Sequence, residues 1–123
     1  MELNIDFNSE EAIYMQVCNQ IIIGIATSRI QEGESLPSVR QLAEEIGINM
    51  HTVNKAYGIL KQEGFVKLDR RRGAVIAVNA DKVRVLNRMK KELAVVVARG
   101  ICNGVDRNDA HNLIDQLYDS FEE

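Results

Sequence analysis

The residues best suited to chemistry in this chain of 123 residues form a short run of hydrogen-bonding side chains near its middle. The run contains five hydrogen-bonding residues and one methionine: Asn49, Met50, His51, Thr52, Asn54 and Lys55. An asparagine amide matches the donor and acceptor edge of adenine, Thr and His can donate or accept hydrogen bonds, and Met can pack against the methyl group of thymine. The run is therefore typical of a segment that contacts base edges in the major groove of DNA.

Basic residues lie on both sides of this run. Arg40 follows Ser38 at the start of an expected helix, where free amide groups and a cation together suit a phosphate. Arg70, Arg71 and Arg72 occupy a polar turn, and arginine is favoured in a narrow minor groove because of its negative potential. These positions predict contacts to the DNA backbone and to a second groove.

Five of these residues also have an alternative interpretation that is purely structural. Arg40 has an acidic residue, Glu44, one helical turn further on, so a surface ion pair is possible. The arginine triplet could protect the end of a hairpin from aggregation. Thr52 could act as a cap at the edge of the core.

The distribution of charge supports a nucleic-acid partner for the middle of the chain, although the formal net charge is -3. Residues 1–28 contain four acidic and no basic residues, and residues 92–123 contain seven acidic residues against two arginines. Residues 29–91 contain thirteen Lys and Arg against seven acidic residues. This pattern excludes indiscriminate coating of nucleic acid by the whole surface and predicts one basic face.

Other function classes find little support in the sequence. No phosphate-binding loop or zinc-protease motif is present, and His51 and His111 lie on different expected elements. Cys18 and Cys102 stand alone, so we expect buried or half-buried thiols within helices rather than metal ligands. The longest apolar stretch, residues 21–26, is far shorter than the ~20 residues of a membrane span, and no secretory signal is visible. We expect no enzyme activity, no cofactor, no metal, no membrane partner and a cytoplasmic location.

The elements that position the candidate site follow from apolar periodicity and capping residues. Ser9 is expected to cap a helix that runs to about Arg29. Ser38 and Gln41 form a capping box that opens a second helix, which Gly47 ends. Asn49 is expected to cap a third helix that ends at Gly64. Two short helices joined by a tight turn with glycine are typical of a helix-turn-helix.

The remaining sequence predicts a hairpin and a helical tail. Residues 65–68 and 74–78 are rich in β-branched residues and flank a turn that ends at Gly73, which indicates a wing. A long helix is expected from about Asp81 to Asn103, and Asp106 is expected to cap a last one. The apolar positions of these two helices that we expect to bury a dimer interface are Leu86, Met89, Leu93, Val96, Val97, Leu113, Leu117 and Phe121.

The predicted fold is thus mainly α with a small β-hairpin wing: a winged helix-turn-helix followed by a C-terminal helical hairpin. We expect two parts, a DNA-binding domain over residues 1–79 and a two-helix dimerisation tail over residues 80–123.

Four stretches of the chain resemble the GntR family of bacterial transcription regulators. They are residues 13–17 (IYMQV), 36–43 (LPSVRQLA), 52–57 (TVNKAY) and 60–66 (LKQEGFV), and the resemblance spans residues 10–78 in order. It implies a winged helix-turn-helix that binds DNA as a dimer. The tail of about 45 residues is too short for a large effector domain, and resembles that of the YtrA-like branch.

The resemblance also assigns roles to individual positions. Arg40 matches the arginine of the family that contacts phosphate or base, and Ser38 matches the small residue before it. Asn49, His51 and Thr52 fall on positions of the recognition helix, and Arg72 and Gly73 fall on the wing tip. The chain departs from the family at Met50 and Asn54, where many members have arginines, and at Ala74, where a second glycine is usual.

The sequence therefore predicts a cytoplasmic homodimer that binds a palindromic double-stranded operator, most simply as a repressor. The alternative is a winged-helix module for protein interaction without specific DNA binding, which the acidic ends and the missing arginines favour. A ligand-gated regulator would need a pocket, for which the tail leaves little room, and no effector can be named from the sequence.

Overall fold

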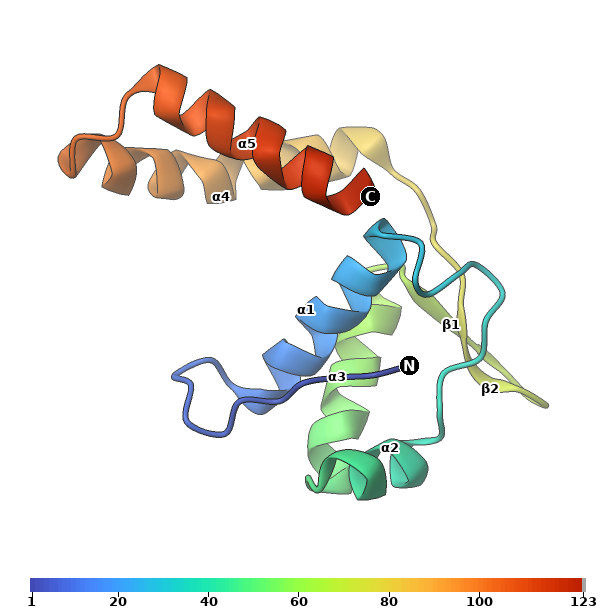
Figure 1. Ribbon diagram of the computed structural model, residues 1–123. Helices are drawn as coiled ribbons and strands as arrows, with labels where there is room; N and C mark the ends of the chain where they lie inside the picture. The colour runs from blue at the N-terminus through green and yellow to red at the C-terminus, as the bar shows by residue number, and fades with distance from the viewer. Residues whose placement is uncertain (123) are drawn as a thin grey trace. The chain divides into compact units, whose positions relative to one another are not determined.

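Three helices and one β-hairpin make up the chain up to Asn79. They are α1 (Ile13–Ala26), α2 (Val39–Ile46), α3 (Met50–Gln62), β1 (Val66–Asp69) and β2 (Gly73–Ile76) (Figure 1). The structure is a computed structural model that describes residues 1–122. It divides into two compact parts, which we call the N-terminal unit (Met1–Asn79) and the C-terminal unit (Ala80–Glu123).

Helix α1 begins and ends differently from the prediction. Ser9 does not cap it: the helix starts after Ala12, and the Ser9 hydroxyl accepts a hydrogen bond from the Glu11 amide instead. The cause is Gln16, which is buried and whose side-chain amide donates to the carbonyl groups of Asp6 and Glu11. These bonds hold residues 6–11 in a turn, so the helix cannot extend backwards. It also ends at Ala26 rather than near Arg29.

Ser38 and Asn49 are confirmed as helix caps, but the predicted capping box is incomplete, because in the described structure the Gln41 side chain does not bond back to the Ser38 amide. The Ser38 hydroxyl accepts from the Gln41 amide at 3.1 Å, and the Asn49 side-chain oxygen accepts from the His51 amide at 2.7 Å. Gly47 ends α2 in the left-handed conformation, with φ of 79°, which glycine adopts at little cost. The turn from α2 to α3 is therefore determined by local side-chain and backbone preferences.

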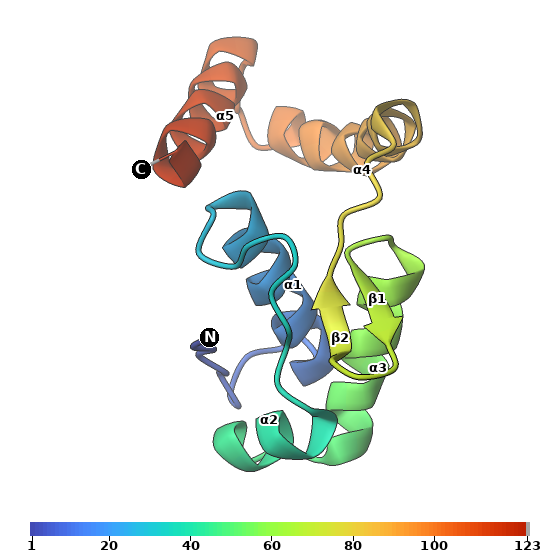
Figure 2. The same ribbon diagram turned by 90° about the vertical axis from the view of Figure 1, so that its right-hand side faces the viewer.

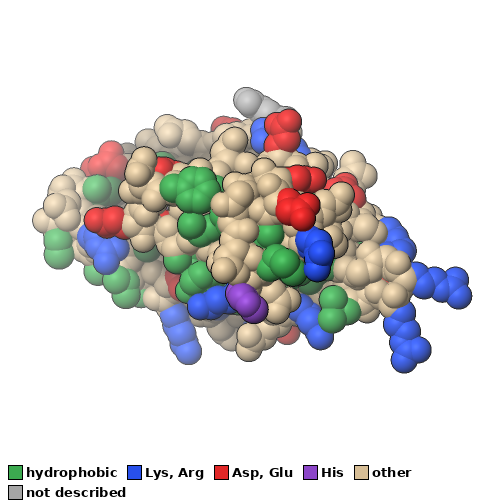
Figure 3. Space-filling model, turned by 90° about the horizontal axis from the view of Figure 1, so that it is seen from below, with side chains coloured by type: hydrophobic (Ala, Val, Ile, Leu, Met, Phe, Trp, Pro, Cys, Tyr) green, Lys and Arg blue, Asp and Glu red, His purple; other side chains and the backbone are tan. Residues whose placement is uncertain are grey.

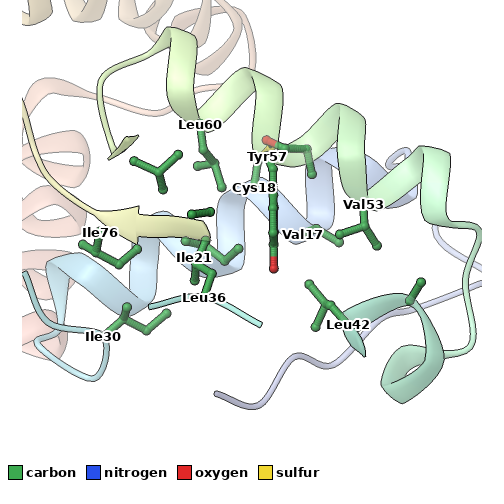
Figure 4. Packing of buried hydrophobic residues seen from close by; sticks show 14 residues of the cluster. Val17, Cys18, Ile21, Ile30, Leu36, Leu42, Val53, Tyr57, Leu60 and Ile76 are labelled. Carbon is green, nitrogen blue, oxygen red and sulfur yellow. The ribbon is translucent and has the colours of Figure 1, made fainter. Parts of the chain in front are cut away.

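One apolar core holds the N-terminal unit together (Figure 4). Val17, Ile21, Val53, Leu60 and Ile76 have at most 1% of their surface exposed. Such complete burial stabilises each side chain by roughly 1.5–3 kcal/mol relative to water.

The α1–α3 contact also contains a buried thiol. The Cys18 thiol donates to the Ala56 carbonyl at 3.3 Å. Burial, together with the negative charge of Glu63, raises the Cys18 pKa to about 11. Cys18 is therefore the structural thiol that the sequence predicts.

The hairpin has the predicted topology, with one addition. Strands β1 and β2 are antiparallel and pair Val66 with Ile76 and Asp69 with Gly73 (Figure 2). The segment 33–36, between α1 and α2, lies along the other edge of β2. Ser35 bridges Val75, and the Leu36 amide donates to the Ala74 carbonyl. This contact joins residues that are far apart in the sequence, so no local sequence pattern predicts it.

The C-terminal unit consists of two helices, α4 (Lys82–Cys102) and α5 (Arg107–Glu122). Their predicted caps are confirmed, because Asp81 accepts from the Arg84 amide and Asp106 accepts from the Asp109 amide. Neither helix has a buried residue within the described part of the chain. Cys102 is exposed, against the expectation of a buried or half-buried thiol, because it is the last residue of α4, a helix with no buried residue in the described part of the chain.

Candidate nucleic-acid interface

The start of α2 presents a cap and a cation side by side. Ser38 is extended and caps the helix, and Arg40 is the second helical residue, with its side chain exposed. The alternative ion pair between Arg40 and Glu44 does not form in the described structure, which leaves the guanidinium available. Free amide groups, the positive end of the helix dipole and this cation suit an anionic oxygen.

A buried tyrosine of α3 holds the start of α2 in place through a hydrogen bond. The Tyr57 hydroxyl donates to the Pro37 carbonyl at 2.8 Å, directly before the cap Ser38. Burial, aided by the negative charge of Glu45, raises the Tyr57 pKa well above its ordinary value, so the phenol keeps the proton that it donates. The spacing of Tyr57 in the sequence gives no sign of this polar contact with a residue 20 positions away.

Helix α3 carries the run of polar residues on its outer face. Met50, His51, Asn54 and Lys55 are exposed, and Thr52 is half-buried at the flank of the helix. The buried residues of α3 lie on the opposite side of the helix, as expected for 3.6 residues per turn. The oxygen of Asn49 is already used as the cap of α3, which leaves its amide nitrogen for another contact.

The wing tip is ordered by its own side chains. The Asp69 carboxylate accepts from the amides of Arg71 and Arg72 at 2.8 and 3.0 Å, and these bonds, with the nearby cationic side chains, lower the Asp69 pKa. The Arg72 guanidinium donates to the Gly33 carbonyl. Gly73 has φ of 73°, a conformation that favours glycine. Arg72 thus ties the wing to the segment 33–36, and all three arginines are exposed.

The predicted site residues of the N-terminal unit gather at one end. A shallow hollow of about 380 Å³ between α2 and α3 has Arg40 and Met50 in its lining. Seen from this end, a basic side chain lies directly beside a histidine, and long basic side chains project at the right-hand margin (Figure 3). The arrangement is a helix with hydrogen-bonding side chains between two sources of positive charge.

The residues predicted for dimerisation are placed in the C-terminal unit, with their side chains largely open. Leu86 is 53% exposed, Val96 56% and Leu113 57%, and Phe121 is half-buried. Together these side chains form an apolar surface that no other part of the described residues buries.

The comparisons with known proteins agree with this architecture. The family model of bacterial regulatory proteins of the gntR family matches residues 13–76, which include α1, the helix-turn-helix and the hairpin. The chain belongs to the gntR family.

Three similar proteins extend the comparison to the tail. The transcriptional repressor YtrA of Bacillus subtilis is 33% identical over 118 residues, which are 94% of this chain and 91% of that protein. The structure of YtrA from Sulfolobus acidocaldarius, a GntR-family transcription factor, has a TM-score of 0.67 at 36% identity, and covers 81% of this chain and 97% of that one. A transcriptional antiterminator from Listeria monocytogenes has a TM-score of 0.89 at 27% identity, covering 100% and 94%.

These findings assign the chain to the YtrA-like gntR regulators, which bind DNA. The assignment makes it a transcriptional regulator and not an enzyme. In the described residues, none of the helices combines the length and the hydrophobicity needed to cross a membrane.

Proposed function

We propose that this regulator is a repressor that binds a palindromic operator as a homodimer. In this proposal the N-terminal unit is the DNA-binding domain, with α3 in the major groove and the wing tip at a minor groove. The C-terminal unit is the dimerisation domain. The observation that carries the proposal is the exposed polar face of α3 between Arg40 and the wing arginines. The repressor role is supported by the similarity to YtrA of Bacillus subtilis.

Within this interface we assign different tasks to different residues. The face of α3, with Met50, His51, Thr52, Asn54 and Lys55, would contact bases and the adjoining phosphates. Ser38 and Arg40 would bind a phosphate, and Arg70 and Arg71 would approach the minor groove. Asn49 and Arg72, with their partners inside the protein, would mainly hold the helix and the wing in place, with Gly73 shaping the tip.

The apolar surface of the C-terminal unit supports the homodimer. Residues 93–102 of α4 include a single charged side chain, Arg99, so this half of the helix is apolar almost all round. A monomer rarely exposes a contiguous apolar patch larger than a few hundred Å². A second copy supplies an identical surface, and a two-fold dimer would present two α3 helices to the two half-sites of a palindrome.

The proposal implies a place of action and leaves the effector open. Operator DNA of a bacterium lies in its cytoplasm, so we expect the protein there. Regulation of the repressor by its own abundance or by a partner protein requires no pocket for a small molecule. A thermal-shift screen with metabolites would detect a small effector.

The test is selection from a library of random double-stranded DNA by the purified full chain. We expect enrichment of one inverted-repeat motif, with a stoichiometry of two chains per duplex. Enrichment of a single non-repeated site would contradict the homodimeric mode. Failure to enrich any motif, with the protein folded, would contradict sequence-specific binding and favour the module for protein interaction.

A further inference from the structure

A lysine of the recognition helix rests on an aromatic ring of the neighbouring helix. The Lys55 ammonium nitrogen lies 4.0 Å from the centroid of the Tyr14 ring. An ammonium group within about 6 Å of a ring face is attracted by the negative potential of that face. The pair joins α3 to α1 at the outer edge of their contact.

The tyrosine is held more firmly than the lysine. Tyr14 is half-buried and packs against the core of the N-terminal unit. One turn further along α1, Cys18 is buried and bonds to the carbonyl of Ala56, the residue directly after Lys55. This bond holds α1 against α3 next to the pair, so the Tyr14 ring has a fixed position. Lys55 is exposed and has a long side chain with many rotamers.

From this geometry we infer that Tyr14 is a positioning residue that holds the Lys55 ammonium ready for a backbone phosphate on the α1 side of the recognition helix. The inference rests on the proposed function, since it requires α3 to lie on DNA. A phosphate can bind the ammonium protons that point away from the ring, so the ring contact and the phosphate contact are compatible.

The expected benefit is entropic. An unrestrained lysine loses much of its rotamer freedom when it binds a phosphate, and a side chain that is already ordered loses less. Arg40 lies on the start of α2, and Lys55 leans towards α1. The pair would therefore add an anchor to the recognition helix on its α1 side, apart from the anchor at α2.

Binding can be measured on the duplex that the wild-type protein enriches from the random library, over a salt series from about 50 to about 200 mM. Lys55→Gln should lower the slope of log affinity against log salt by about 0.9, the value for one lost phosphate contact. Tyr14→Leu should leave the slope unchanged, because the charge remains, and weaken binding by about two- to tenfold. Tyr14→Phe, which keeps the ring, should bind like the wild type.

A double-mutant cycle separates positioning from a merely structural role. The effect of Tyr14→Leu should vanish in the Lys55→Gln background and persist in the Lys61→Gln background, since Lys61 lies on the same helix away from Tyr14. An equal effect of Tyr14→Leu in all three backgrounds would overturn the inference. So would an unchanged salt slope for Lys55→Gln.

A measurement on the free wild-type protein keeps the inference testable if Tyr14→Leu does not fold. The ring should shift the NMR signals of the Lys55 ε-methylene protons upfield, and Tyr14→Phe should retain the shift. Signals at ordinary positions in the wild type would overturn the inference. If the wild type enriches no duplex, the proposed function fails, and this NMR measurement still shows whether the pair exists.

Discussion

The two units of this protein bury their apolar residues to very different degrees. In the N-terminal unit, Val17, Ile21, Val53 and Leu60 are completely shielded. In the C-terminal unit, Leu86, Leu93 and Val97 keep 39–53% of their surface exposed, although α4 is the longest helix of the described chain. The N-terminal unit therefore has a core of its own, and the C-terminal unit offers a surface that association would bury. The N-terminal unit thus folds around its own core, and our proposal assigns assembly to the exposed surface of the C-terminal unit.

The largest effect should come from the core of the N-terminal unit. Leu60→Ala removes a side chain with 0% exposure, and we expect a loss of about 2–5 kcal/mol in the free energy of unfolding. Leu68→Ala, at 66% exposure on the wing, should change it by less than about 0.5 kcal/mol. Urea unfolding of both variants checks this, and similar losses would contradict the assigned core.

A substitution in the apolar surface of the C-terminal unit should change the oligomeric state of the protein and leave the fold of the N-terminal unit intact. Leu93→Glu places a charge within the apolar stripe of α4, so we expect monomers in sedimentation equilibrium. Operator affinity should fall by about 100-fold, because binding of the two half-sites is no longer linked. Lys91→Glu introduces the same residue beside the stripe and should leave the dimer intact. A dimeric Leu93→Glu variant would exclude this face as the interface.

Two helical glycines test burial within the N-terminal unit itself. Gly24 is buried, and a Cβ there would lie 2.6 Å from Cδ1 of Ile30, so Gly24→Ala should cost about 1–3 kcal/mol. Gly58 in α3 has no atom within 4 Å of the same position. Gly58→Ala should raise stability by up to about 1 kcal/mol through helix propensity. Thermal unfolding of the free protein gives both values, and equal signs would contradict the packing around Ile30.

The smallest of the expected effects concerns the candidate DNA interface of the N-terminal unit. Arg40→Ala should weaken operator binding by somewhat more than about 1 kcal/mol and lower the salt slope by about 0.9. Arg29→Ala removes the same charge in the turn after α1 and should have little effect on either quantity. Fluorescence anisotropy over a salt series measures both variants. An unchanged affinity for Arg40→Ala throughout the series would remove Arg40 from the interface.

Most of the secondary structure is predictable because its signals are local. Ser38, Asn49, Asp81 and Asp106 each cap a helix within three residues of their own position, and apolar periodicity marks the buried faces. The one cap that fails, Ser9, fails because Gln16 competes for the chain before α1. The motif stretches likewise identify the family, since their residues and order are visible in the sequence.

Local signals thus account for the elements, their order, the basic middle segment and the candidate residues of the interface. How these residues are held depends instead on contacts between distant parts of the chain. The contacts of Tyr57 with Pro37, of Arg72 with Gly33 and of Lys55 with Tyr14 join residues 20 to 41 positions apart. Such pairs depend on how the helices and the wing pack, and packing distributes the chain's apolar surface as a whole. For the same reason, only the structure shows how completely the N-terminal unit buries its apolar side chains and how much of those in the C-terminal unit stays exposed.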